Sequence, residues 1–154
     1  MDSIDESSWG ENMKILPNQE MSDLSKSLEY VNSAGITQVD VVGVDGGDYG
    51  HVFGVMASMA EAPSGMRLRM HFESGILYLC SSTNGGFSEY LRMGQKFSVC
   101  ALTPSKGTTV RGGKWRLENE ALSFSTRGLS NEGTGDLVTV SSDGPLAIFV
   151  SELI

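Results

Sequence analysis

The sequence predicts a mainly β domain, an antiparallel sandwich or barrel of about eight to ten strands with one N-terminal amphipathic helix packed on it. Apolar and polar side chains alternate with a period of two through much of the chain after Gly35, as in half-buried strands. Many of the 19 glycines lie beside Asn, Asp or Ser and interrupt this alternation, which is typical of tight turns. Helical spacing is absent between these runs, so the pattern disfavours parallel β-α-β architecture.

Length and composition predict one domain. The chain has 154 residues, of which 40% are hydrophobic and 19% charged, values that suit a single globular core. We expect residues 1–16 to form an acidic N-terminal arm and residues 17–154 a single β-rich domain. No run approaches the ~20 apolar residues of a membrane helix, and the start of the chain does not resemble a signal peptide. We therefore expect a soluble protein, cytoplasmic or part of an intracellularly assembled particle.

The predicted helix spans residues 19–33. Asn18 is a plausible cap for its N-terminus, and Gly35 is a plausible stop. Apolar residues recur between them at the spacing of one helix face: Met21, Leu24, Leu28 and Val31. This face is expected to pack on the sheet.

Strands are predicted throughout the remainder of the chain. The clearest spans residues 66–73, where apolar side chains at even positions alternate with polar side chains at odd positions. Residues 45–48 read Asp-Gly-Gly-Asp and predict a hairpin turn between neighbouring strands at 36–44 and 51–59. A further hairpin is predicted across residues 118–120, and residues 127–135 form the longest predicted loop. The other predicted strands are 76–81, 87–93, 97–102, 137–141 and 146–153. Cys80 and Cys100 lie within two of them and are expected to be buried free thiols.

Charge is segregated along the sequence. Residues 1–62 carry a formal charge of −9, residues 92–116 carry +6, and residues 117–154 carry −5, within a net charge of −8. In one interpretation, basic and acidic strands are neighbours and their charges pair across the surface. In the other, residues 105–116 form a basic, glycine-rich loop that binds an anionic small molecule or nucleotide. The candidate ligand-binding residues of that loop are Lys106, Thr108, Thr109, Arg111, Lys114 and Trp115. Nucleic acid is a poor fit, because the rest of the protein is acidic.

A convincing catalytic set is missing from the sequence, so an enzyme is the weaker expectation. His51 and His71 are the only histidines, and neither lies in a recognisable motif. A small hydrolase or metal-dependent enzyme would have to use one of them. A metal site would need Asp45 and Asp48 to meet both histidines. We predict no catalytic residue, metal site or cofactor.

The leading functional hypothesis is a non-catalytic protein-binding or assembly module. It could be an inhibitor or immunity-like protein that caps a basic site, or a structural subunit of a larger assembly. A protein partner or homo-oligomer is expected, and no membrane. The candidate partner-binding residues are Trp9, Asp45 and Asp48. The mass in solution would separate this hypothesis from the anion-binding alternative.

Overall fold

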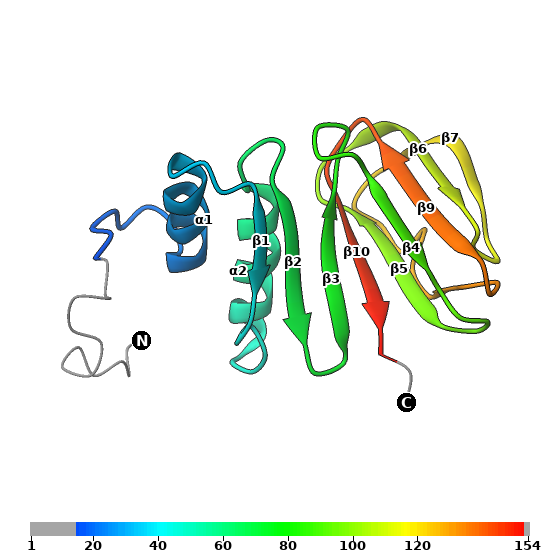
Figure 1. The fold of residues 1–154 in the computed structure, drawn as a ribbon, viewed down its shortest axis with the longest axis horizontal. Helices are drawn as coiled ribbons and strands as arrows, with labels where there is room; N and C mark the ends of the chain where they lie inside the picture. Colours follow the sequence, from blue (N-terminus) through cyan, green and yellow to red (C-terminus); the bar gives the residue numbers. More distant parts are fainter. Residues whose placement is uncertain (1–14, 153–154) are drawn as a thin grey trace.

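The computed structural model describes residues 15–152, which form two helices and ten strands (Figure 1). The strands pack in two sheets, and this arrangement confirms the predicted mainly β fold class. None of the helices in this part of the chain is long and apolar enough to cross a membrane. In chain order the elements are α1 (Asp23–Ser33), β1 (Gln38–Val41), α2 (Tyr49–Ala60), β2 (Arg67–Phe72), β3 (Gly75–Cys80), β4 (Phe87–Tyr90), β5 (Lys96–Ala101), β6 (Ser105–Arg111), β7 (Leu117–Leu122), β8 (Asn131–Glu132), β9 (Leu137–Ser142) and β10 (Leu146–Ser151).

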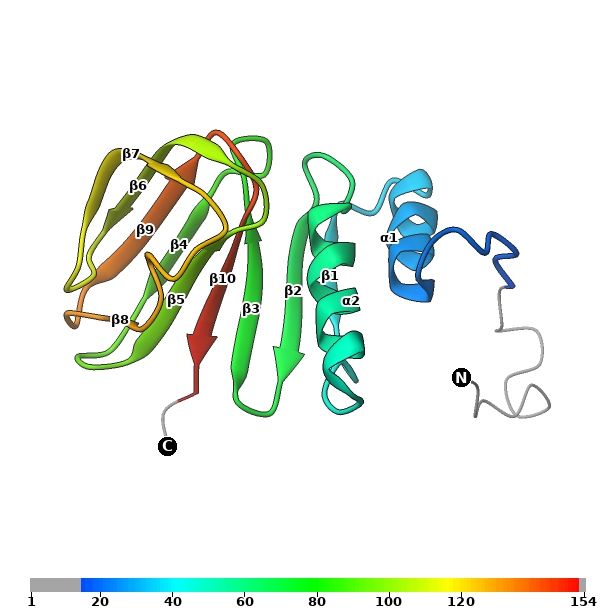
Figure 2. The same cartoon turned by 180° about the vertical axis from the view of Figure 1, so that it is seen from behind.

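The larger sheet has the strand order β1-β2-β3-β10-β5-β8, and the smaller sheet has the order β4-β9-β6-β7. The paired strands are antiparallel except for β1 and β2, which run parallel. The smaller sheet packs over the part of the larger sheet formed by β3, β10 and β5, and together they make a β-sandwich. Helix α2 lies on the opposite face of the larger sheet, at β1 and β2 (Figure 2).

Strand β3 belongs to two cores because its side chains alternate between the two faces of the larger sheet. Leu77 and Leu79 face the helices, where they meet Leu28 of α1 and Met59 of α2. Cys80 lies in the core between the two sheets, and burial raises the pKa of its thiol to about 12. The other buried residues of this sandwich core are Phe87, Leu91, Phe97, Val99, Ala101, Val110, Leu117, Leu122, Val138, Val140, Leu146, Ile148 and Val150.

Helix α1 starts later than the sequence predicted. Ser22 is the N-cap, because its hydroxyl accepts the backbone N–H of Ser25 at 3.0 Å. The side chain of Asn18 instead accepts the N–H of Glu20 at 2.9 Å in a turn before the helix. Both residues are good caps, and sequence alone does not rank two such caps four positions apart.

The predicted strand at residues 51–59 is wrong, since this segment belongs to helix α2 (Tyr49–Ala60). Asp48 caps the helix by accepting the N–H of His51 at 3.0 Å. A short, continuous apolar run suits a buried helix as well as a strand. The buried residues of α2 lie on one helical face: Val55, Ser58 and Met59.

This helix also corrects the expectation that parallel β-α-β architecture is disfavoured. The segment β1-α2-β2 is a parallel β-α-β unit, the connection that two parallel neighbouring strands need. The hairpin predicted at residues 45–48 is therefore absent, and these residues lead from β1 into the cap of α2.

Two polar segments predicted as a loop and a turn are strands. Residues 105–111, within the predicted loop 105–116, form β6, and residues 118–120 lie inside β7. The inward side chains of β6 include Ser105 and Thr108, so the strand lacks an apolar period-two signal. Their hydroxyls form a buried cluster with Ser142, in which Ser105 and Ser142 approach within 2.7 Å. Hydrogen bonds within the cluster offset the free energy that is lost when these polar side chains leave water.

Asp143 completes this cluster and gives a pH-dependent prediction. Its carboxylate accepts the Ser105 hydroxyl and the N–H groups of Lys106 and Gly107, and these bonds lower its pKa. A lowered folded-state pKa contributes stability that is complete above the ordinary carboxyl pKa and is lost as pH falls through the folded value. We expect Asp143→Asn to lower the urea midpoint at pH 7 and to differ less from the parent below about pH 4.

The control for this experiment is Glu29→Gln, which removes an exposed carboxylate on α1. This variant should track the parent chain at both pH values. An equal loss of stability at both pH values for Asp143→Asn would contradict the assigned role of the carboxylate.

Candidate functional site

A pocket of about 270 Å³ opens at the edge of the sandwich, between β5, β6, the start of β7 and the segment leading into β8. Its apolar lining comes from both sheets, because Val99 belongs to β5 while Val110 and Leu117 belong to β6 and β7. Trp115 and Asn131 contribute an indole and an amide. The remaining lining residues are Arg116, Arg127, Gly128 and Leu129. Such a mixture of apolar walls and a few polar groups is typical of small-molecule sites.

Asn131 fixes the backbone of Trp115. The Asn131 side chain is buried, with 3% exposed. Its amide nitrogen donates to the Trp115 carbonyl at 2.6 Å, and its oxygen accepts the Trp115 N–H at 3.1 Å. The same oxygen accepts the N–H of Glu132 at 2.8 Å. Because its backbone is held on both sides, Trp115 keeps its indole at the pocket while 53% of the residue stays exposed.

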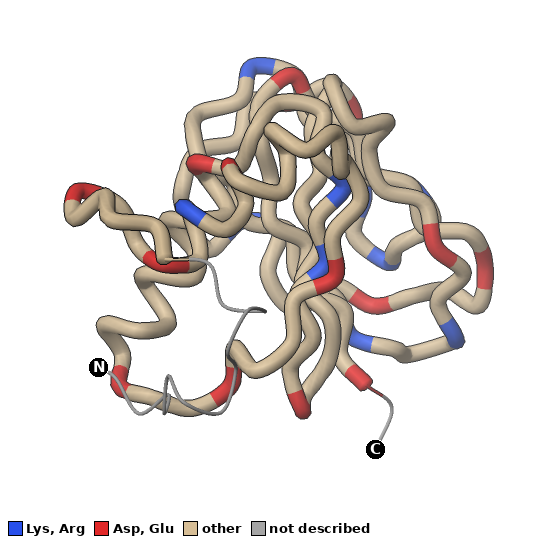
Figure 3. The backbone as a smooth tube through the Cα atoms, turned by 60° about the vertical axis from the view of Figure 1, so that its left-hand side comes forward, with Lys and Arg blue, Asp and Glu red and all other residues tan. Residues whose placement is uncertain are grey.

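Several charges around the pocket are paired, whereas Arg116, which lines it, has no carboxylate within 4.0 Å among the described residues. Arg127 pairs with Glu120, and Glu132 accepts both Lys96 and Lys114, whose hydrogen bonds lower the pKa of Glu132. Figure 3 shows lysine and arginine positions interspersed with aspartate and glutamate positions over the sandwich. These contacts agree with the first interpretation of the charge pattern, in which basic and acidic strands are neighbours.

The six residues proposed for an anion site do not converge. Thr108 is buried in the hydroxyl cluster, and the Thr109 hydroxyl accepts the N–H of Asn119. Arg111 pairs with Glu118, and the Lys106 N–H binds Asp143. Lys114 and Trp115 do meet at the pocket, where the Lys114 ammonium lies 4.6 Å from the centre of the Trp115 ring.

The other candidate residues are spread over the N-terminal half. Asp48 caps α2, and Asp45 accepts the N–H of Glu73 at 2.8 Å. His71 bonds Asp40 of the neighbouring strand at 2.6 Å. Residues 15–152 contain no group of three or more His, Cys, Asp or Glu side chains placed to hold a metal ion. Trp9 lies outside the described residues.

Sequence reasoning singled out Trp115 but missed its partners. Val99, Val110 and Asn131 come from separate segments and meet only through strand pairing. One local signal was available, since residues 127–135 were the longest predicted loop and this segment forms one side of the pocket.

A family model described as thiamin pyrophosphokinase, vitamin B1 binding domain, matches residues 86–147. Every residue that lines the Trp115 pocket lies inside this segment. No curated protein sequence matches the chain.

Solved structures share the fold. A thiamine pyrophosphokinase from Bacillus subtilis aligns with a TM-score of 0.70 and 19% identity, over 88% of this chain and 65% of that one. A protein from Lactobacillus plantarum aligns with a TM-score of 0.72 and 18% identity, over 90% and 70%. Thiamin pyrophosphokinase from Candida albicans aligns with a TM-score of 0.54 and 12% identity, over 86% and 53%. The chain thus spans about two thirds of the length of the Bacillus protein.

These comparisons correct the leading functional hypothesis. A non-catalytic protein-binding or assembly module, inhibitor or structural protein is contradicted, because the matched family and the similar structures from Bacillus subtilis and Candida albicans carry the name of an enzyme. A small-molecule ligand agrees with the description of the matched domain, whereas the predicted protein partner or homo-oligomer stays a prediction. Over residues 86–147 the chain matches the vitamin B1 binding domain of thiamin pyrophosphokinases, and over most of its length it shares their fold.

Proposed function

We propose that this chain binds thiamin, vitamin B1, in the pocket beside Trp115, as part of a thiamin pyrophosphokinase. The supporting observation is a coincidence of two findings. The segment that matches the vitamin B1 binding family, residues 86–147, contains all the residues that line one preformed pocket with an accessible indole. We assign the binding and orientation of thiamin to the described residues, and the pyrophosphokinase reaction to the whole enzyme.

The chemistry of the pocket suits thiamin. The ligand joins a flat aminopyrimidine to a positively charged thiazolium ring, and an indole face attracts both flat rings and cations. Val99, Val110 and Leu117 supply apolar contacts. The Lys114 ammonium at the Trp115 ring pairs with Glu132, a carboxylate that it shares with Lys96. The net charge of −8 also favours the approach of a cation.

Replacing Trp115 tests the proposal. A cation–π and stacking contact is worth about 1–2 kcal/mol at a partly desolvated site, so Trp115→Ala should weaken thiamin binding roughly fivefold to thirtyfold. Isothermal titration calorimetry of the full chain with thiamin measures the change.

Phe124→Ala is the matched control, because Phe124 is another exposed aromatic residue in the same half of the chain and is not among the pocket residues. It should bind thiamin as the parent does. Equal affinities of Trp115→Ala and the parent, or no binding of thiamin to the parent, would overturn the proposal.

A further inference from the structure

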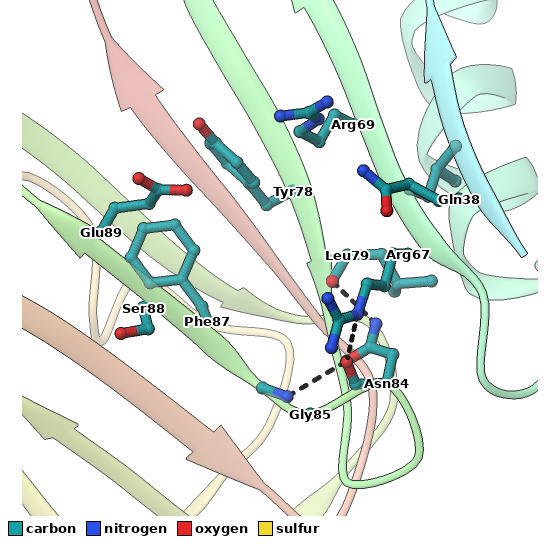
Figure 4. A pocket seen from close by; sticks show the side chains of 12 residues that line it. Gln38, Arg67, Arg69, Tyr78, Leu79, Asn84, Gly85, Phe87, Ser88 and Glu89 are labelled. Carbon is teal, nitrogen blue, oxygen red and sulfur yellow. Dashed lines mark hydrogen bonds between the residues drawn. The ribbon is translucent and has the colours of Figure 1, made fainter.

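A second cavity lies between the β1-β2-β3 end of the larger sheet and strand β4 of the smaller sheet. It has a volume of about 260 Å³ and shares no residue with the Trp115 pocket. Its walls come from β1, β2 and β3 on one side and from the first residues of β4 on the other. In Figure 4, Gln38 and Arg67 stand on the β1–β2 side, and Ser88 and Glu89 stand on the β4 side.

A buried asparagine builds one end of this cavity. The Asn84 side chain donates to the carbonyls of Met66 and Leu79 at 3.1 and 2.9 Å, and it accepts the N–H of Ser81 at 2.9 Å. The turn that it holds presents the Asn84 carbonyl, which accepts Nε of Arg67 at 3.2 Å. One edge of the Arg67 guanidinium is therefore fixed, and its two terminal nitrogens remain to bind a ligand.

The charge of Arg67 is left uncompensated. Among residues 15–152, no carboxylate lies within 4.0 Å of it. Arg69, two positions along the same face of β2, differs because it pairs with Asp40 at 2.7 Å. The hydrogen bonds from Arg69 and His71 lower the pKa of Asp40, so this carboxylate stays ionised and pairs with Arg69 at neutral pH. The Arg69 charge also interacts with the charge of Glu89.

The opposite end of the cavity is acidic. Glu89 of β4 lies beside Tyr78, whose pKa is raised by burial and by the charge of this carboxylate. In the described part of the chain, Glu89 also has no cation within 4.0 Å. The Tyr78 ring packs edge-on against Phe87, with ring centroids 5.1 Å apart, and this contact holds it in the wall of the cavity.

We propose that this cavity binds a small zwitterion, with an oxyanion held by Arg67, an apolar or flat body along Tyr78, and a protonated amine at Glu89. A guanidinium with one edge already fixed binds a carboxylate or phosphate through a fork of two N–H groups. Gln38 and Ser88 line the same space and offer neutral hydrogen bonds to the body of the ligand. The site is separate from the proposed thiamin pocket, because the two cavities have no residue in common.

The test uses probes that separate the two charges. 4-(Aminomethyl)benzoate carries a carboxylate and an amine at opposite ends of a ring, whereas benzoate and benzylamine each keep one charge. Phosphoethanolamine replaces the carboxylate by a phosphate and distinguishes the two sources of oxyanion. Each probe is titrated into the full ¹⁵N-labelled chain, and backbone amide shifts are followed by nuclear magnetic resonance.

We expect a zwitterion to shift the amides of residues 84–89 with a Kd near 1 mM or tighter, at least fivefold tighter than either single-charge probe. Arg67→Gln should abolish binding, and Glu89→Gln should reduce zwitterion affinity to that of benzoate. Arg92→Gln removes an arginine outside this cavity and should change nothing. The amide spectrum of each variant reports whether it is folded.

Two results would overturn this assignment: no saturable shift at residues 84–89 with either zwitterion, or unchanged affinity in folded Arg67→Gln. Trp115→Ala should retain zwitterion binding. Failure of the thiamin proposal would thus leave this result unaffected, and the reverse also holds.

Discussion

Gly112→Ala is expected to lower the free energy of unfolding by about 3 kcal/mol or more. Gly112 follows β6 with φ +76°, a left-handed conformation that costs a side-chain-bearing residue about 1–2 kcal/mol. A Cβ at this position would also run into the Leu137 carbonyl of the neighbouring strand β9, and it would lie 2.9 Å from Cα of Val138. Both obstacles are backbone atoms of a central strand, so the chain must distort to relieve the clash.

Gly94→Ala is the matched control for conformation. Gly94 has φ +77°, but no atom lies within 4 Å of an added Cβ. This variant should therefore lose only the conformational cost, about 1–2 kcal/mol. Urea denaturation of the two variants and the parent gives both values. Equal losses in the two variants would show that the close approach to β9 is not what requires glycine at position 112.

Asn131→Ala is expected to cost about 2–4 kcal/mol of stability and most of the thiamin affinity. The substitution removes the buried amide that bonds both the N–H and the carbonyl of Trp115, together with the N–H of Glu132. Backbone groups left without partners cost about 1–3 kcal/mol each when they are buried. Trp115 would also lose its fixed position at the pocket, so thiamin binding should weaken tenfold or more.

Asn84→Ala separates the loss of stability from the loss of thiamin affinity. Asn84 is an equally buried asparagine with several backbone partners, but it lies at the Arg67 cavity. Its loss should destabilise the chain to a similar degree, weaken zwitterion binding and leave thiamin binding intact. Denaturation curves and calorimetry on both variants test this. Weakened thiamin binding in both variants, or in neither, would contradict a local role for Asn131.

Strands with apolar residues at alternate positions were predictable from sequence. Residues 66–73 contain β2, and Leu68 and Met70 face the helix core as their spacing requires. The strand predicted at residues 51–59 was wrong, because a continuous apolar run carries no period that distinguishes a helix from a buried strand. Strand β6 was not predicted because it carries too few apolar residues. Ser105 and Thr108 occupy buried positions where a strand normally carries apolar side chains.

The site was less predictable than the fold because it depends on strand register. Trp115 was predicted as a ligand residue, but Val99 and Asn131 reach it only through the pairing of β5 with β8 and the meeting of the two sheets. The local charge of +6 in residues 92–116 suggested an anion site. Pairing with Glu118 and Glu132 neutralises part of it, and those pairs also depend on tertiary structure. The division into an arm at residues 1–16 and one domain at residues 17–154 stays a prediction.

The most direct test of thiamin binding follows the indole N–H of Trp115 by nuclear magnetic resonance while thiamin is added to the full chain. The structure predicts a saturable shift of this signal, accompanied by the amides of residues 128–131. The shifts of residues 128–131 should disappear in Trp115→Ala. Saturable shifts confined to other parts of the chain, or none at all, would contradict the assignment of the Trp115 pocket.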